Sequence, residues 1–115
     1  MANHRAGKLR ILATSGKTRS PFVTDVPTFA EQGFADLTVE EWFGFFVPAR
    51  TPADVITRLN SALRVALAAS ETVSGLAAMG LEAQSSTPAE LGQRLRRDHD
   101  RWGPLVKQIG FTAEG

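Results

Sequence analysis

The stretch Leu37-Thr-Val-Glu-Glu-Trp-Phe-Gly-Phe-Phe-Val-Pro48 decides how this chain folds. Its first half alternates apolar and polar residues and its second half is almost entirely apolar, which is typical of a strand that enters a buried sheet. Gly44 inside the stretch indicates a bulge or a close approach of another backbone. Immediately afterwards, Thr51-Pro52-Ala-Asp54 predicts a helix with Thr51 as N-cap and Pro52 at the first helical position. The sequence therefore predicts a strand over 37–48 that leads into a helix.

Upstream of this stretch, the sequence predicts one more strand and a long loop. Leu9-Arg-Ile-Leu-Ala-Thr-Ser15 alternates in hydrophobicity between two glycines and is expected to be a strand. Residues 16–27 contain two prolines and several turn formers, so they predict a loop. Thr28 and Glu31 have the spacing of a capping box, and Gly33 supplies the left-handed exit of a short helix.

Downstream, three helices are expected. An apolar stripe predicts an amphipathic helix over 52–69, and a shorter helix follows, with Ser70 as its cap and Gly80 as its exit. Residues 81–85 are compatible with an edge strand. Thr87-Pro88-Ala-Glu90 then repeats the helix-opening signature and predicts a final helix over 88–109, in which Pro104 is expected to cause a kink or a break.

The composition is that of an ordinary globular protein and excludes several classes. Of the 115 residues, 43% are apolar, the net charge is +1 and there is no cysteine. Such a chain presents no large basic field for nucleic acid, and it has neither disulfides nor thiolate ligands for a metal. Its longest apolar stretch, 42–48, is far shorter than the roughly 20 residues of a membrane-spanning helix. The amino end lacks the apolar run of an export signal, so the chain as written is expected to be cytoplasmic.

Few residues carry the signature of a chemical site. Ser15-Gly16-Lys17-Thr18 is similar to the end of a phosphate-binding loop, but Ile11 stands where that loop needs its first glycine. His99 is expected on the apolar stripe of the last helix as a structural or interfacial residue, with the adjacent acids pointing away from it. His4 is expected in a frayed amino end. Two such distant histidines predict no metal site.

Two charged clusters have both a structural and a functional interpretation. Glu40 and Glu41 stand beside large aromatic residues, where a glutamate can serve as an acid or base. The favoured interpretation is that they are surface acids at the entrance of a strand whose aromatic residues enter the core. The last helix carries four arginines, which most simply form a solvated face, with phosphate binding as the functional alternative: Arg94, Arg96, Arg97 and Arg101.

Several motifs occur together in an order that is typical of one family. In chain order they are Gly7-Lys-Leu-Arg-Ile-Leu-Ala-Thr-Ser15 with Arg19, Asp25-Val-Pro-Thr28, Glu31 and Gly33, Trp42-Phe-Gly44 with Pro48, Thr51-Pro52, Leu59-Asn60, Gly80, Thr87-Pro88-Ala-Glu90 and Arg101-Trp102. Over residues 7–112 the chain resembles the later portion of the tripartite tricarboxylate transporter receptors, the Bug-type periplasmic solute-binding proteins. Members of that family are longer, two-lobed α/β proteins that close on a small organic acid or a related metabolite and present it to a membrane permease.

The resemblance implies the C-terminal part of a two-lobed, type II periplasmic-binding-protein-like fold of the α/β class. Residues 1–38 would belong to the second lobe, 39–48 to a strand that crosses the hinge, and 49–115 to the helical part of the first lobe. It implies a periplasmic, non-enzymatic receptor for small carboxylates, with no cofactor, no metal and no nucleic-acid partner.

Four residues are the candidates for ligand contact. Thr14 and Ser15 come at the carboxyl end of a predicted strand, where α/β clefts bind their ligands. Trp42 and Phe43 are placed to wall the hinge side of the cleft. A carboxylate in such a cleft is best held by oriented backbone amides and helix amino termini.

Two predicted strands are too few for a sheet covered on both faces, so the chain is expected to be a truncated part that self-associates as a dimer or by strand exchange. The alternative function is a helix-rich, self-associating interaction module that captures no ligand and binds through the apolar stripe of 52–69 or 88–109. A small hydrolase using Glu41 or His99 ranks last, because no nucleophile, base and orienting partner occur together.

Overall fold

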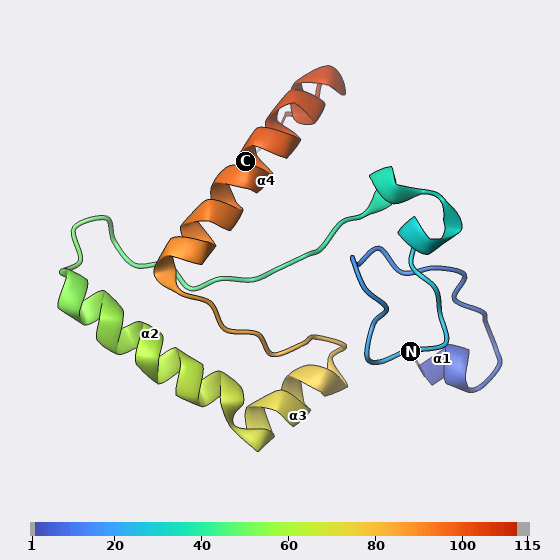
Figure 1. The fold of residues 1–115 in the computed structure, drawn as a ribbon, viewed down its shortest axis with the longest axis horizontal. Helices are drawn as coiled ribbons and strands as arrows, with labels where there is room; N and C mark the ends of the chain where they lie inside the picture. The colour runs from blue at the N-terminus through green and yellow to red at the C-terminus, as the bar shows by residue number, and fades with distance from the viewer. Residues whose placement is uncertain (1, 113–115) are drawn as a thin grey trace. The chain divides into compact units, whose positions relative to one another are not determined.

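The computed structural model describes residues 2–112. Its elements are α1 (Ala2–Arg5), the 3-10 helices η1 (Ala30–Gln32) and η2 (Ala35–Leu37), α2 (Ala53–Ala68), α3 (Ser70–Ala78) and α4 (Pro88–Gln108) (Figure 1). The described residues divide into two compact units, those within Met1–Phe43 and Val73–Glu82 and those within Gly44–Thr72 and Ala83–Gly115.

The predicted strands are wrong for this structure. Among residues 2–112, neither 9–15, 37–48 nor 81–85 forms a strand, and the β-pairing that remains is an isolated parallel bridge between Thr14 and Thr28. The physical reason is that a strand is held by hydrogen bonds to a neighbouring strand. An apolar, extended segment without such a neighbour has the propensity for a strand but forms none. The alternating pattern in the sequence was therefore not sufficient to predict strands, because no segment of the described chain pairs with these residues.

The first unit has a small core built around the bridge. Its buried residues are Val23, Val26 and Thr28, of which Thr28 is 1% exposed. The Thr14 N–H donates to the carbonyl of Pro27 at 3.0 Å, and the Phe29 N–H donates to the carbonyl of Thr14 at 2.9 Å. Residues 16–27 are turns and bends without regular structure, so the predicted loop is confirmed. The loop brings residues 27–29 back to Thr14, and its residues Val23 and Val26 are buried there.

The predicted capping box at Thr28 is confirmed. The Glu31 N–H donates to Thr28 Oγ1 at 3.1 Å, and the Thr28 N–H donates to Glu31 Oε2 at 2.7 Å. Arg19 Nε donates to both oxygens of the Glu31 carboxylate at 3.0 Å, and Arg19 Nη1 donates to the carbonyl of Thr24 at 3.2 Å. Gly33 ends η1 with a φ of 88°, the left-handed exit that the sequence predicted. These contacts fasten the loop to η1.

Helix α2 of the second unit begins one residue later than predicted. Helix α2 spans Ala53–Ala68, close to the expected 52–69, but its N-cap is Pro52, with an extended ψ of 145° and no side-chain cap. The expected Thr51 cap is therefore wrong. The Thr51 N–H instead donates to the carbonyl of Pro48 at 3.0 Å, so Thr51 belongs to the preceding turn. The fixed φ of proline is compatible with an N-cap as well as with the first helical position.

Helix α3 confirms the predicted short helix but not its cap. Ser70 is the first residue of α3 rather than the residue before it. The helix ends at a left-handed Gly80 with a φ of 78°, and the Leu81 N–H donates to the carbonyl of Leu76 at 2.9 Å. This exit matches the sequence prediction. Gly75 lies in the helix interior, with no atom within 4 Å of the position a Cβ would take.

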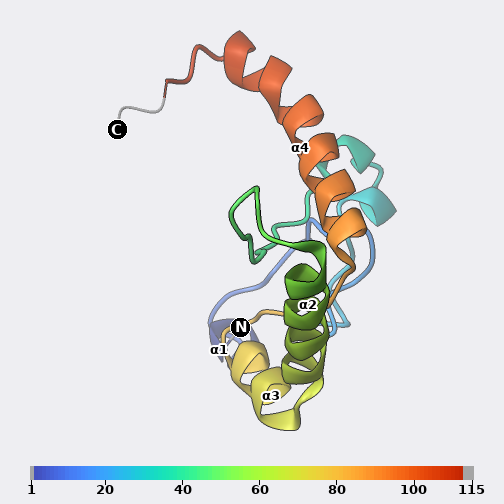
Figure 2. The same cartoon turned by 90° about the vertical axis from the view of Figure 1, so that its left-hand side faces the viewer.

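Helix α4 begins at the capping box that the sequence predicted. Its capping box is complete, with the Glu90 N–H donating to Thr87 Oγ1 at 3.2 Å and the Thr87 N–H donating to Glu90 Oε2 at 2.8 Å. The helix runs through Pro104 to Gln108, so Pro104 causes no break, and the kink that was the other expected outcome stays a prediction (Figure 2). Pro104 has no N–H for the carbonyl of Asp100, but Asp100 lies on an exposed face, where water can take that place.

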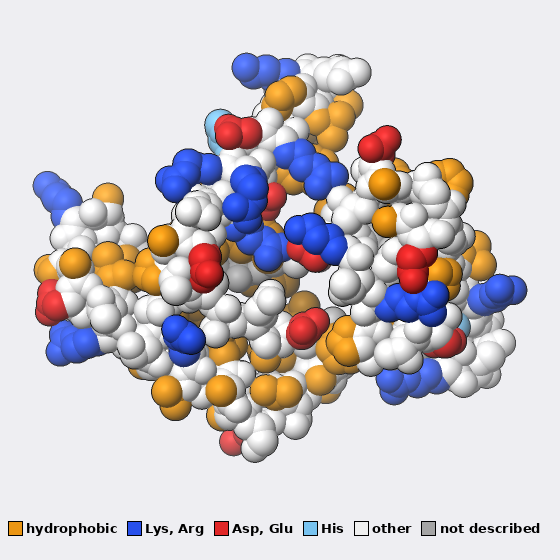
Figure 3. Space-filling view, viewed as in Figure 1, with side chains coloured by type: hydrophobic (Ala, Val, Ile, Leu, Met, Phe, Trp, Pro, Cys, Tyr) orange, Lys and Arg blue, Asp and Glu red, His pale blue; other side chains and the backbone are white. Residues whose placement is uncertain are grey.

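Apolar side chains remain exposed on both units. No residue of α2, α3 or α4 is buried, and orange hydrophobic side chains gather at the surface along α2 and α3 (Figure 3). On α4 the predicted stripe is open to solvent at Leu95, Trp102, Leu105, Val106 and Ile109. Soluble monomers rarely expose stripes of this kind, which usually mark surfaces that another polypeptide covers. Among residues 2–112, no helix combines the length and the apolar character needed to cross a membrane.

Candidate functional site

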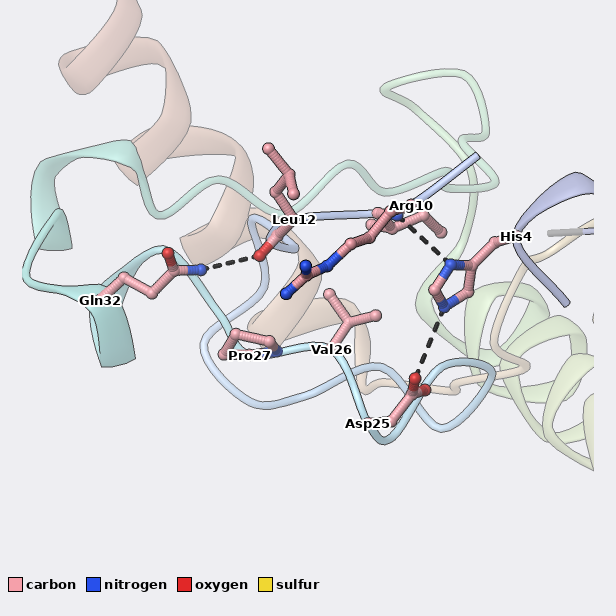
Figure 4. Close-up of a pocket in the computed structure, with 8 residues that line it drawn as sticks. His4, Arg10, Leu12, Asp25, Val26, Pro27 and Gln32 are labelled. Carbon is pink, nitrogen blue, oxygen red and sulfur yellow. Dashed lines mark hydrogen bonds and ion pairs between the residues drawn. The ribbon is translucent and has the colours of Figure 1, made fainter. Parts of the chain in front are cut away.

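The first unit contains an open pocket of about 360 Å³. The pocket is lined by His4, Arg10, Ile11, Leu12, Asp25, Val26, Pro27 and Gln32 (Figure 4). These residues come from α1, from the segment that was predicted as a strand, from the end of the loop and from η1. The loop closes back onto the 10–12 segment through the Thr14 bridge, and this closure creates the pocket wall.

His4 holds one side of the pocket in place. The Ile11 N–H donates to His4 Nδ1 at 3.3 Å, and His4 Nε2 lies 3.6 Å from Asp25 Oδ2. The side chain of His4 is only 16% exposed, so the expectation of a frayed amino end is wrong at this residue. No sequence signal could have found this contact, because His4 and Asp25 meet only after the intervening loop has closed.

The guanidinium of Arg10 is the free charged group of the pocket. It forms no hydrogen bond or ion pair with another residue of the described chain, and it projects across the pocket toward the side of Gln32 (Figure 4). Gln32 Nε2 donates to the carbonyl of Leu12 at 2.8 Å, which ties η1 to the Arg10 segment. The pocket thus offers a forked cationic donor to an anion, with Asp25 as an acidic group on the opposite side.

Thr14 and Ser15, two of the predicted ligand residues, are held through their backbones. Besides the bridge bonds of Thr14, the carbonyl of Ser15 accepts from the Val39 N–H at 2.8 Å. The hydroxyl of Thr14 is buried without a hydrogen-bond partner, whereas Ser15 is exposed. The amides of residues 15–17 form no backbone hydrogen bond with any described residue. The backbone N–H groups of residues 15–17, directly after the Thr14–Thr28 bridge, are therefore available as hydrogen-bond donors.

Trp42 and Phe43, the other two predicted ligand residues, lie in the same unit. Trp42 is half-buried, and Phe43 is 75% exposed. The Val39 to Ser15 bond brings the beginning of this segment next to the Thr14–Ser15 turn. None of the four predicted ligand residues lines the pocket, so the pocket and the predicted contacts are separate features of the first unit.

The other candidate residues show no assembled chemistry. His99 is 84% exposed in its side chain, and its Nδ1 lies 3.3 Å from Asp100 Oδ1. The expectation that the adjacent acids point away from His99 is therefore wrong for Asp100, because the short aspartate can fold toward a neighbour on an exposed helix face. Within residues 2–112, no three side chains among histidines and acids gather as metal ligands would.

Solved structures show which class of protein has this fold. A chain described as "Structure of a periplasmic transporter" superposes with a TM-score of 0.76 at 34% sequence identity, over 94% of this chain and 36% of that one. The expected fold class, part of a two-lobed α/β periplasmic-binding-protein-like fold, is thereby confirmed. The match holds although the strands are unpaired here, because the path of the chain and its helices is retained.

The chain belongs to the tripartite tricarboxylate transporter family receptors, whose family model matches residues 1–111. It is 34% identical over 103 residues to the "UPF0065 protein in clcB-clcD intergenic region" of Pseudomonas knackmussii, covering 89% of this chain and 61% of that protein. It is 31% identical to Protein BugT of Bordetella pertussis, covering 92% of this chain and 32% of that protein. The chain thus spans between a third and three fifths of the length of these relatives. The family is one of transport receptors rather than enzymes.

Proposed function

We propose that this chain is part of a periplasmic solute-binding receptor that captures a small carboxylate and presents it to the membrane permease of a tripartite tricarboxylate transporter. The observation that carries the proposal is the family match over residues 1–111, together with the fold likeness to a periplasmic transporter. The proposed receptor performs no chemical conversion of its ligand. It needs only a complementary cleft and a surface that the permease recognises.

In this proposal, the carboxylate lies against the turn after Thr14. Its oxygens accept hydrogen bonds from the free amides of residues 15–17 and from the exposed hydroxyl of Ser15. Backbone amides suit this role because they are oriented donors that need no further ordering when the anion arrives. Thr14 holds the turn, and its hydroxyl contacts the ligand only if the turn opens. Trp42 and Phe43 supply an apolar wall for the carbon skeleton.

The proposed organisation of the whole receptor follows the same division. Residues 1–38 belong to the second lobe, 39–48 form the strand that crosses the hinge, and 49–115 are the helical part of the first lobe. The bond from the Val39 N–H to the carbonyl of Ser15 supports this division, since it links the ligand turn to the start of the hinge segment. Closure of the lobes on a ligand would then change the environment, and with it the fluorescence, of Trp42.

A titration tests the proposal. A panel of di- and tricarboxylates is added to the chain while Trp42 fluorescence is followed in a Trp102→Phe background, so that the signal comes from one tryptophan. We expect a saturable change with at least one carboxylate, and weaker binding in Ser15→Ala. Ser85→Ala, an exposed serine of the second unit, is the matched control and should bind as the parent does. A panel without any saturable response contradicts ligand capture by this chain.

A second candidate function is a helix-rich module that self-associates and captures no ligand. The observation that favours it is the solvent-exposed apolar stripe of α4, together with exposed Leu59 and Val65 on α2. Light scattering across a range of concentrations separates the two functions. A stable oligomer that dissociates in Leu105→Glu and responds to no carboxylate supports the second function.

A further inference from the structure

The pocket of the first unit holds two opposite charges apart. Arg10 and Asp25 lie on opposite sides of this cavity of about 360 Å³ (Figure 4). Neither the Arg10 guanidinium nor the Asp25 carboxylate forms a hydrogen bond with another residue of the described chain. The ionic contact of Asp25 is with His4 Nε2 at 3.6 Å, and the Asp25 side chain is 75% exposed. Both charged groups are therefore available to a ligand.

The hydrogen bond of His4 shows that this residue adds no charge to the pocket. The Ile11 N–H donates to His4 Nδ1 at 3.3 Å, so this nitrogen carries no proton. The proton of the neutral ring is then on Nε2, which faces Asp25 Oδ2. The residues that line the pocket thus contribute one positive group, one negative group and no net charge.

The rest of the lining suits the carbon skeleton of a small molecule. Val26 and Pro27 follow Asp25 directly in the chain, and they line the pocket together with Leu12. Sites for small molecules combine such apolar surface with a few polar groups and have volumes of roughly 300–1,000 Å³. The volume of this pocket is near the lower end of that range, so it fits a molecule with few carbon atoms.

The separation of the charges indicates which class of small molecule fits. A simple monocarboxylate engages Arg10 and leaves Asp25 unpaired, and a simple amine does the reverse. A dianion such as succinate brings a second negative charge toward Asp25, which is unfavourable. A molecule that has both a carboxylate and an ammonium group satisfies both sides, and the fork of a guanidinium matches the two oxygens of a carboxylate.

We propose that this pocket is a site for a small zwitterion, whose carboxylate pairs with Arg10 and whose ammonium group pairs with Asp25. The bond from Gln32 Nε2 to the carbonyl of Leu12, at 2.8 Å, holds the wall toward which Arg10 projects. The site is separate from residues 15–17, where the proposed function places a carboxylate, and it does not depend on that proposal. Because both charged groups face solvent, the dissociation constant is expected to be millimolar.

The test is a titration of the chain followed by the chemical shifts of its backbone amides. The ligands are glycine, β-alanine and γ-aminobutyrate, which hold the same two charges at increasing separations. The amides of Leu12, Asp25 and Val26 report on the pocket, and those of residues 15–17 report on the turn. We expect a saturable shift at the pocket amides with at least one of the three zwitterions. Its dissociation constant should be at least about fivefold lower than those of acetate, methylammonium and succinate at this site.

Two variants assign the two charges. Arg10→Gln removes the cation and keeps hydrogen-bonding groups, and it should weaken zwitterion binding at least about fivefold. Asp25→Asn should remove the preference, so that the zwitterion and acetate bind within about twofold of each other. The matched controls are Arg50→Gln and Asp36→Asn, because both residues are exposed and lie outside the pocket. Both controls should bind the zwitterion as the parent does.

Amide exchange at Thr14 and Phe29 checks the fold of each variant, because these amides form the bonds of the bridge beside the pocket. Their exchange should match that of the parent. If a variant loosens the bridge, the ranking of ligands in the parent chain still decides the question.

Three outcomes overturn the proposal. They are the absence of a saturable shift at the pocket amides up to about 100 mM ligand, a parent chain that binds acetate as tightly as the zwitterions, and zwitterion binding that Arg10→Gln and Asp25→Asn leave unchanged. Shifts at residues 15–17 with carboxylates, without any at the pocket, support the proposed function and overturn this second site. Pocket shifts without any at 15–17 do the reverse.

Discussion

Thr28 is a buried polar residue that pairs with Thr14 at the turn where we propose that the ligand binds. The Thr28 hydroxyl accepts a hydrogen bond from the Glu31 N–H at 3.1 Å. Thr28 is 1% exposed and pairs with Thr14 through the parallel bridge. Thr28→Val keeps the shape of the side chain and replaces the hydroxyl, which is the acceptor of this bond, with a methyl group. Loss of a threonine N-cap costs about 1 kcal/mol, within a general range of roughly 0.5–2.

The measurement is amide hydrogen exchange at Glu31. A loss of about 1 kcal/mol in the local opening free energy corresponds to about fivefold faster exchange. The increase should extend to the amides of Thr14 and Phe29, which form the bonds of the bridge, because water cannot replace the missing hydroxyl without opening the unit. Under the proposed function, the same variant should weaken carboxylate binding, since it loosens the turn that presents the free amides.

Thr87→Val is the control, because Thr87 forms the same capping box at α4 but is exposed. Water can take over the role of its hydroxyl, so exchange at Glu90 should increase less than exchange at Glu31 does in Thr28→Val. The reasoning is refuted if Thr28→Val leaves the Glu31 amide unchanged, or if the exposed cap proves the more sensitive of the two.

Three further predictions concern charge and glycine. The hydrogen bond from the Thr28 N–H, aided by Arg19, lowers the pKa of Glu31 in the folded chain from 4.5. The ionised Glu31 carboxylate therefore stabilises the fold above pH 4.5, and this stabilisation is lost as the pH falls through the lowered pKa. Protection of η1 should therefore fall on acidification below about pH 4.5 in the parent chain and show no such step in Glu31→Gln, and an unchanged step in that variant would contradict the assignment. Gly75→Ala should raise the thermal stability of α3 by about 1 kcal/mol, because the added methyl meets open space and helix entropy is regained, as followed by far-ultraviolet circular dichroism. Gly80→Ala should lower it by about 1 kcal/mol in the same assay, because the left-handed exit is strained for alanine, and equal stability would show that the exit is dispensable.

Helices α2, α3 and α4, two capping boxes and two glycine exits could be predicted from the sequence because their determinants are local. Helices α1 and η2 were not predicted, and the caps expected at Thr51 and Ser70 were wrong. The capping boxes at Thr28 and Thr87 each need only a partner three residues away, and the left-handed exits at Gly33 and Gly80 need only a residue without a Cβ. The wrong cap at Thr51 is a local error of one residue, because proline is accommodated either as N-cap or as first helical residue.

The family, and with it the fold class, was also accessible from the sequence. The order and spacing of short motifs from Gly7 to Trp102 predicted the receptor family, and the match over residues 1–111 confirms it. The identification rests on many weak local signals in a fixed order. It did not require that any single motif be decisive.

The sequence by itself determined the approximate extents of α2, α3 and α4 and the family to which the chain belongs. Only the tertiary structure decided that the segments predicted as strands stay unpaired, that His4 meets Asp25, and that Arg10 faces an open pocket. The physical reason is the range of the interactions involved. A helix satisfies its own backbone within four residues, whereas a strand or a pocket depends on groups that the fold must bring from elsewhere in the polypeptide.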